Sequence, residues 1–188
     1  MKKVLILSGA GISAESGIKT FRNSGGLWEE FDVQTVCSVE GFKNNPNVVN
    51  KFYDMRRQDL SNKVPNKAHH TLAKLKMDYP YQVILITQNV DDLFEKAGCK
   101  DVIHLHGTLT DLRCQQCEHV FSIGYASQEG VKCPSCSSSN IRHNVVMFGE
   151  LAPMYEKLHE AINDTEYLVV IGSSGQVINI AMFAQWYE

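Results

Sequence analysis

Four of the six cysteines form two close pairs, and their spacing is the most specific chemical signal in the sequence. Cys114-x-x-Cys117 and Cys133-x-x-Cys136 are separated by fifteen residues. In a reducing compartment, two thiolate pairs on facing knuckles are better suited to complete a tetrahedron around zinc than to form disulfides. Four sulfur ligands leave no position for water, so we expect one structural zinc ion. The alternative, four unrelated core cysteines, does not explain the doubled spacing.

A glycine turn near the start of the chain could bind phosphate groups. Residues 8–14, Ser-Gly-Ala-Gly-Ile-Ser-Ala, directly follow an apolar run at residues 3–7. They match Gly-x-Gly-x-x-Ala, a turn in which bare backbone amides approach a pyrophosphate. The usual second strand ending in an acidic residue about 20 residues later is missing. Residues 20–28, rich in glycine and polar groups, stand there instead, and we interpret them as a loop that closes over a ligand.

Polar or small residues follow three further apolar runs. They are Gln88, Asn89 and Asp91 after residues 83–87, His106 after residues 102–105, and Gly172-Ser173-Ser174-Gly175 after residues 167–171. The carboxyl ends of parallel strands form the ligand crevice of such sheets, so we expect these residues to face one crevice. Asn89 or Asp91 could instead be a buried helix cap.

His106 is the candidate general base. It stands at a predicted strand end, it is followed by a glycine that admits a ligand, and histidine titrates near neutral pH. His104 should point to the same face of the strand. It belongs to the apolar run, however, and we interpret it as packed.

Buried strands alternate with helical patterns along most of the chain. Strands are expected at residues 3–7, 83–87, 102–105 and 167–171, and helices at 47–60, from 65 onward, and at 91–97, 155–162 and 178–187. This alternation predicts a parallel α/β fold whose sheet is covered on both faces. It lapses at residues 37–64, which look helical, and at 111–142, the cysteine ribbon. Both segments are interpreted as insertions that form a smaller domain.

The composition argues against nucleic acid or membrane as a partner. The 188 residues include 18 basic and 21 acidic side chains, and the net charge of -3 gives no general attraction for polyanions. The apolar runs are far shorter than the roughly 20 residues that a bilayer span needs, and the start of the chain is a poor signal peptide. We therefore expect a cytoplasmic protein. Cys37 and Cys99 are interpreted as packed thiols.

Taken together, the motifs resemble the sirtuins, the NAD-dependent protein lysine deacylases. The resemblance runs in family order from residue 4 to about residue 181. It includes Gly9-Ala10-Gly11-Ile12-Ser13 with Gly17, Phe21 and Arg22; Thr87-Gln88-Asn89-Val90-Asp91; His104-Leu105-His106-Gly107; the paired cysteines; Val146-Met147-Phe148-Gly149-Glu150; and Gly172-Ser173-Ser174.

The resemblance implies two domains with NAD and an acyl-lysine protein or peptide meeting between them. A Rossmann-like NAD-binding domain would contain residues 1–36, 65–110 and 143–188, and a small domain would contain the helical residues 37–64 and the zinc ribbon 111–142. The residues implied to bind NAD are Gly9, Ala10, Gly11, Ser13, Phe21, Arg22, Gln88, Asn89, Asp91, Gly172, Ser173 and Ser174. Val146, Met147, Phe148, Gly149 and Glu150 would pair with the substrate backbone as an added strand.

The same resemblance implies the chemistry. The acyl oxygen would displace nicotinamide at the ribose C1′, and His106 would then remove a proton from a ribose hydroxyl, which attacks the resulting imidate. The products would be free lysine, nicotinamide and O-acyl-ADP-ribose. Asn89 is the second residue assigned a catalytic role. A crevice framed by glycines suits this reaction, because water must be excluded until the acyl group is captured.

A finer match concerns the acyl group. Tyr53-x-x-Arg56 resembles the motif of the sirtuin class that removes acidic acyl groups. Positions three apart share a helix face, so the phenol and the guanidinium could reach one carboxylate, and Ala14 would leave room for a longer acyl chain. We therefore expect activity on succinyl, malonyl and acetyl groups. By spacing alone, an ordinary surface arginine beside a packed tyrosine is the favoured alternative.

Two other functions use the same features. A protein mono-ADP-ribosyltransferase would share the NAD pocket, and a non-catalytic module would bind an NAD metabolite or dock through its zinc ribbon. His106 argues for deacylation. Relative to the family, the chain is expected to be short at its C-terminus, and an uncovered sheet edge there would favour self-association.

Overall fold

The main sheet has four parallel strands in the order β3-β2-β1-β7. They are β1 (Val4–Ser8), β2 (Val83–Thr87), β3 (Ile103–His104) and β7 (Tyr167–Ile171). The computed structural model describes residues 2–19, 31–180 and 183. In it, β1 lies inside the sheet between β2 and β7, which explains its unbroken run of aliphatic residues. The predicted parallel α/β fold is confirmed.

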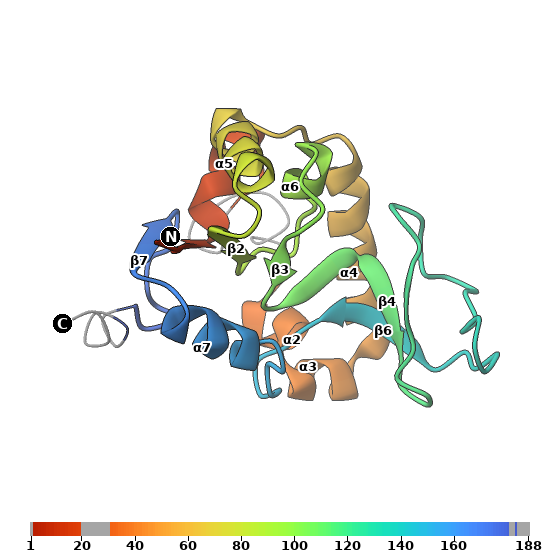
Figure 1. Ribbon diagram of the computed structural model, residues 1–188. Helices are drawn as coiled ribbons and strands as arrows, with labels where there is room; N and C mark the ends of the chain where they lie inside the picture. Colours follow the sequence, from red (N-terminus) through yellow and green to blue (C-terminus); the bar gives the residue numbers. More distant parts are fainter. Residues whose placement is uncertain (1, 20–30, 181–182, 184–188) are drawn as a thin grey trace.

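Helices cover both faces of this sheet (Figure 1). They are η1 (Ala10–Ser16), α5 (Lys67–Asp78), α6 (Leu93–Lys96) and α7 (Tyr155–Asn163). Leu5 of β1 points into the core shared with Leu158 of α7, whereas Ile6 points into the core shared with Leu72 of α5. Because side chains alternate along a strand, β1 anchors two cores at once. The turn that follows β1 is therefore held by packing on both sides of the sheet.

A second, antiparallel sheet has the strand order β5-β4-β6. Its strands are β4 (Gly107–Cys114), β5 (Val120–Ser122) and β6 (Ile141–Val145), and it lies beside α2 (Val33–Cys37), α3 (Val39–Asn44) and α4 (Pro46–Ser61). Phe52, Leu109 and Val145 join these helices to β4 and β6 in a third core. The sheet starts at Gly107 and ends at Val145, outside the segment 111–142. The proposed division into two domains stays a prediction.

The longest helix of the described residues is α4, which spans 16 residues. It begins with Pro46, which suits the first turn of a helix, and Val49, Phe52, Tyr53 and Leu60 form its buried face. In the described part of the chain, no helix is both long and apolar enough to cross a membrane. The predicted helix at residues 47–60 is confirmed.

Three predicted elements differ from the structure. The strand expected at 102–105 is limited to Ile103–His104. The helix expected at 91–97 is the single turn Leu93–Lys96, because the Asp91 carboxylate accepts from the N–H of Leu93 and Gly98, at φ +98, ends the turn. The helix expected at 178–187 does not begin at Ile178. This residue lies in a bend and packs into the core of α7, and Ile180 lies in a turn. Apart from residue 183, its remainder lies outside the described residues.

Candidate active site

The glycine turn after β1 packs directly against the loop after β7. The N–H of Gly9 donates to the carbonyl of Ile171 at 2.9 Å, and the N–H of Gly11 donates to that of Gly172 at 2.8 Å. A Cβ atom at Gly11 would lie 2.8 Å from the Gly172 oxygen, so a larger residue would displace the loop. Gly172 has φ +66, a conformation that favours glycine. The two loops therefore form one fixed edge at the carboxyl ends of β1 and β7.

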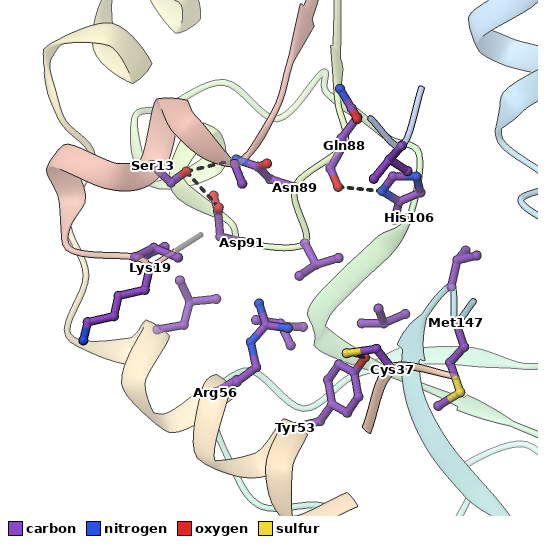
Figure 2. A pocket seen from close by; sticks show the side chains of 18 of the residues that line it. Ser13, Lys19, Cys37, Tyr53, Arg56, Gln88, Asn89, Asp91, His106 and Met147 are labelled. Carbon is purple, nitrogen blue, oxygen red and sulfur yellow. Dashed lines mark hydrogen bonds between the residues drawn. The ribbon is translucent and has the colours of Figure 1, made fainter. Parts of the chain in front are cut away.

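A cavity of about 880 Å³ opens beside this edge and extends to α4. This volume lies within the range of about 300 to 1,000 Å³ that is usual for ligand sites. The predicted site residues that line it are Ala10, Ser13, Tyr53, Arg56, Gln88, Asn89, Asp91, His106, Val146, Met147, Phe148, Gly149 and Glu150. Figure 2 shows Ser13, Asn89 and Asp91 on one side and Tyr53, Arg56 and Cys37 on the other.

Other predicted residues have different positions. Gly9, Gly11, Gly172, Ser173 and Ser174 do not line the cavity, although the Ser173 hydroxyl accepts from Gln88 Nε2 at 3.0 Å. Ala14 is exposed on η1 and is likewise absent from the cavity wall. Phe21 and Arg22 lie outside the described residues, as does the loop predicted at 20–28.

Ser13 stands at the centre of a buried hydrogen-bond network. Its hydroxyl donates to Asp91 Oδ2 at 2.9 Å and accepts from Asn89 Nδ2 at 3.0 Å. His69 Nε2 lies 3.3 Å from the same oxygen, and His69 Nδ1 accepts from the N–H of Asn66. Since Nδ1 is an acceptor, neutral His69 carries its proton on Nε2. Burial lowers the pKa of His69 to about 4 and raises that of Asp91.

His106 is held in the orientation that a general base requires. Its Nδ1 lies 2.8 Å from the carbonyl oxygen of Gln88, which can only accept, so Nδ1 carries a proton. Burial lowers the pKa of His106, although the Gln88 carbonyl opposes this shift. The neutral ring therefore keeps its lone pair on Nε2, the atom that can take a proton from a substrate.

His104 is unsuited to the same role. Its Nδ1 lies 2.9 Å from the carbonyl oxygen of Asn89 and its Nε2 lies 2.9 Å from Glu95 Oε1. Burial disfavours the charged ring, but the Glu95 carboxylate and the Asn89 carbonyl outweigh it and raise the pKa of His104. Both nitrogens thus donate to acceptors. His104 fixes the segment that carries Asn89 and has no free lone pair for catalysis.

At the α4 side of the cavity, Tyr53 is packed and Arg56 is the charged group. Tyr53 is 1% exposed, its ring stacks on that of His143 with 3.6 Å between centroids, and its hydroxyl donates to Cys37 Sγ at 3.7 Å. The Arg56 guanidinium lies 5.8 Å from the centre of the Tyr53 ring. Burial raises the pKa of Tyr53 and lowers that of His143, so both rings are neutral. A carboxylate entering here would meet Arg56 before the phenol.

Two neighbouring charged residues fasten α4 to the antiparallel sheet. Arg57 is fully buried, and it donates through Nε to the carbonyl of Leu109 at 2.5 Å and pairs with Asp54. The Asp54 carboxylate also accepts from the Ser127 hydroxyl and from the N–H of Gln128 in the cysteine ribbon. The position of α4 therefore depends on the ribbon.

The segment 146–150 runs along one wall of the cavity. The N–H of Val146 donates to the carbonyl of His106 at 2.9 Å, and the N–H of Phe148 donates to that of Cys37 at 2.8 Å. The Phe148 side chain is 48% exposed. This wall thus joins the candidate base to α2 and forms an outer edge of the cavity.

The paired cysteines form a compact cluster of four sulfur atoms suited to zinc. All four Sγ atoms lie within 4.8 Å of one another, and the Sγ atoms of Cys114 and Cys136, and of Cys117 and Cys133, are 3.6 Å apart. Zinc–sulfur bonds of about 2.3 Å in a tetrahedron place sulfur atoms about 3.8 Å apart. The N–H of Gln116 also points at Cys114 Sγ, a contact that favours a thiolate. The donor set and its geometry fit one zinc ion.

Comparison with known proteins decides the family. A sequence profile described as the Sir2 family matches residues 9–179. This chain belongs to the Sir2 family. The NAD-dependent protein deacylase of Campylobacter jejuni strain RM1221 is 52% identical over 188 residues, which cover 100% of this chain and 81% of the relative. The predicted sirtuin resemblance is confirmed.

Two solved Sir2 structures extend the comparison. A Sir2 homologue in complex with NAD is 37% identical, with a TM-score of 0.85 over 99% of this chain and 74% of the other. A Sir2 protein with an inhibitor, 2′-O-acetyl-ADP-ribose and a deacetylated p53 peptide is 33% identical, with a TM-score of 0.75 over 98% of this chain and 76% of the other. The described chain therefore has the fold of solved Sir2 structures.

Sequence reasoning missed three residues of this Sir2 family site. His69 contacts Ser13, Tyr155 contacts His106, and Cys37 lines the cavity. A partial signal existed for His69, because Asn66 precedes it by three residues and the two form a capping box. Tyr155 and Cys37 carried no comparable signal, since their contacts join segments far apart in the sequence.

The buried neutral His69 should make the stability of this Sir2 family chain depend on pH. Its pKa is lowered from 6.5 to about 4, so between these values the unfolded chain binds more protons than the folded one. This contribution to stability is complete above about pH 6.5 and is lost as the pH falls toward 4, at up to about 1.4 kcal/mol per pH unit. Urea unfolding at pH 7 and pH 5.5 should show a steeper loss for the wild type than for His69→Gln, which can keep the capping-box acceptor. His159→Gln, at an exposed histidine of α7, should behave as the wild type. Identical losses in all three proteins would contradict the assignment.

Proposed function

We propose that this Sir2 family protein removes succinyl, malonyl and acetyl groups from lysine side chains of proteins, with NAD as co-substrate. The NAD-dependent deacylase activity follows from the family and from the Campylobacter relative, which bears that name and matches the chain over its full length. The single observation that carries the site assignment is the tether of His106 Nδ1 to the Gln88 carbonyl, which leaves Nε2 as an acceptor at the cavity wall. The solved Sir2 complex with a deacetylated peptide supports a protein substrate.

The residues at the sheet edge fit NAD. The cavity is large enough for a sizeable ligand, and Ala10, Ser13, Gln88, Asn89 and Asp91 in its wall would hold the molecule. Bound NAD would supply an electrophilic ribose carbon and the hydroxyl groups that accept the acyl group. The Ser13 network would keep Asn89 and Asp91 in place, because each of their side chains is already fixed by the same hydroxyl.

His106 would then act through Nε2. Burial keeps the ring neutral at physiological pH, so Nε2 can accept a proton from a substrate hydroxyl. The Gln88 carbonyl, bound to Nδ1–H, would stabilise the positive charge that forms on the ring. Val90, Leu109 and Val145 in the cavity wall would help to exclude water during this step.

The acyl chain would extend toward α4, with the substrate backbone along segment 146–150. A succinyl or malonyl carboxylate at this side would meet the Arg56 guanidinium, and the Tyr53 hydroxyl could exchange its weak contact with Cys37 for the carboxylate. An acetyl group ends before this point, so its removal should depend little on either residue.

Mass spectrometry tests the activity directly. An acyl-lysine peptide incubated with the protein should yield deacylated peptide and O-acyl-ADP-ribose with NAD and neither product without it. ADP-ribosylated protein without deacylated peptide would instead support the transferase. Binding of NAD without any turnover would support the non-catalytic module.

Arg56→Met should lower the catalytic efficiency on succinyl-lysine by about 10-fold to 100-fold, the value of a charge-assisted contact. Efficiency on acetyl-lysine should stay within a few fold. Paired peptides that differ only in the acyl group provide the measurement, and Arg113→Met, which removes an arginine outside the cavity wall, is the control. If Arg56→Met lowered both activities equally, Arg56 would be a structural residue and the acidic-acyl assignment would be withdrawn.

We further propose a cytoplasmic location, because all six cysteines are unpaired and the cluster needs reduced thiols to bind zinc. Self-association through the edge strand β7 is also a proposal. Tyr167 and Val169 of this strand are exposed, and size-exclusion chromatography with light scattering would detect a dimer.

A further inference from the structure

The proton-accepting atom of His106 already has a partner within the protein. Its Nε2 lies 3.0 Å from the hydroxyl oxygen of Tyr155, and both residues line the cavity. The two rings are tilted by 45°, with 5.9 Å between centroids, so the contact is made through the hydroxyl and not by stacking. In the reaction proposed above, the same lone pair must accept a proton from the ribose.

The direction of this hydrogen bond follows from the protonation states. Burial raises the pKa of Tyr155, so its phenol keeps the proton and acts as donor. Nδ1 of His106 is committed to the Gln88 carbonyl, which leaves Nε2 as the acceptor in the neutral ring. Among the described residues, the hydrogen bonds of the His106 ring are those to Gln88 and Tyr155. The other titratable side chains of the cavity wall are Lys19, Cys37, Tyr53, Arg56, Asp59, Lys63, Asp91 and Glu150.

Tyr155 is well placed to hold this contact. It is the first residue of α7, and its ring packs against the core formed by α7 and β1. It also follows segment 146–150, to which the substrate backbone is expected to bind, by five residues. The ring is therefore held by the core between β1 and α7, and Tyr155 lines the same cavity as segment 146–150.

We propose that Tyr155 is a positioning residue that orients Nε2 of His106 before NAD binds and then yields this atom to a ribose hydroxyl. The inference rests on the proposed function of His106. A neutral imidazole nitrogen has one lone pair, so the phenol and the ribose hydroxyl cannot both donate to it fully. The Gln88 carbonyl stays bound to Nδ1 throughout and keeps the ring from turning when the partners exchange.

Tyr155→Phe separates this role from a structural one. The phenol donates to Nε2 of the neutral ring, and its oxygen can accept from Nε2–H of the charged ring. Removing it should therefore shift the pKa of His106 in the free protein by about 0.4 to 1 unit, the worth of one neutral hydrogen bond. The acidic limb of kcat/KM for NAD, which reports the free enzyme, should shift by this amount. The acidic limb of kcat, which reports the complex, should not move, because the ribose has already replaced the phenol.

The control is Tyr81→Phe, since Tyr81 is 84% exposed and outside the cavity wall. Its two profiles should match those of the wild type. A Tyr155→Phe protein in which neither limb moves, or in which both move together, would overturn the proposal. NMR titration of the His106 ring in the free proteins gives the same pKa comparison without turnover. Unchanged titration overturns the role of Tyr155, whereas a shifted titration in a protein without deacylase activity would leave that role standing and refute the proposed function.

Discussion

Replacing His106 by tyrosine should reduce NAD-dependent deacylation by a factor on the order of 100 to 10,000, the usual contribution of a general base. Burial keeps the ring of His106 neutral, and the Gln88 carbonyl fixes its tautomer, so Nε2 carries a free lone pair. A tyrosine at this position has no basic nitrogen to replace it. NAD binding should persist, because the Ser13 network does not involve His106. Steady-state turnover and calorimetric titration with NAD provide the two measurements.

The matched control is His70→Tyr, which introduces the same residue at an exposed position on α5. This variant should keep full activity. If His106→Tyr remained comparably active, the role of base would have to move to another residue. His104 would be tested next, although both of its nitrogens donate to acceptors, so the geometry speaks against it.

The strand-end residues were predictable because their position follows from topology. Parallel strands bring their carboxyl ends to one edge, so residues after three apolar runs had to meet there whatever the lengths of the connections. Gln88, Asn89, Asp91 and His106 all line the cavity for this reason. The zinc cluster was predictable for a different reason, because its spacing encodes the ligand geometry within a single short segment.

The contacts that tune these residues could not be predicted in this way. Ser13 meets His69 across 56 positions, and His106 meets Tyr155 across 49. Such pairs depend on how α5 and α7 pack on the sheet, which periodicity does not specify. The same holds for Tyr53, which was predicted to bind a substrate carboxylate. Its ring stacks on that of His143, and its hydroxyl donates to Cys37 Sγ.

Substituting one of the cluster cysteines by alanine should remove about one zinc ion per chain and much of the folded protein with it. Structural zinc in small domains contributes roughly 10 to 16 kcal/mol of apparent binding free energy, far more than a typical point mutation costs. Cys133→Ala is the preferred variant, because Cys133 is buried in the ribbon. Metal analysis, soluble yield and thermal unfolding should all show the loss.

The matched control is Cys99→Ala, which removes a buried thiol that is not part of the cluster. It should retain zinc and lose little stability.

The order in which the two activities are lost on zinc removal also follows from the structure. Asp54 ties α4 to the ribbon through Ser127 and Gln128, whereas His106 is held by the Gln88 carbonyl next to the main sheet. Protein that remains folded after partial zinc loss should therefore lose succinyl-lysine activity before acetyl-lysine activity. A well-folded, metal-free Cys133→Ala protein with an unchanged ratio of the two activities would rule out the structural zinc and its link to α4.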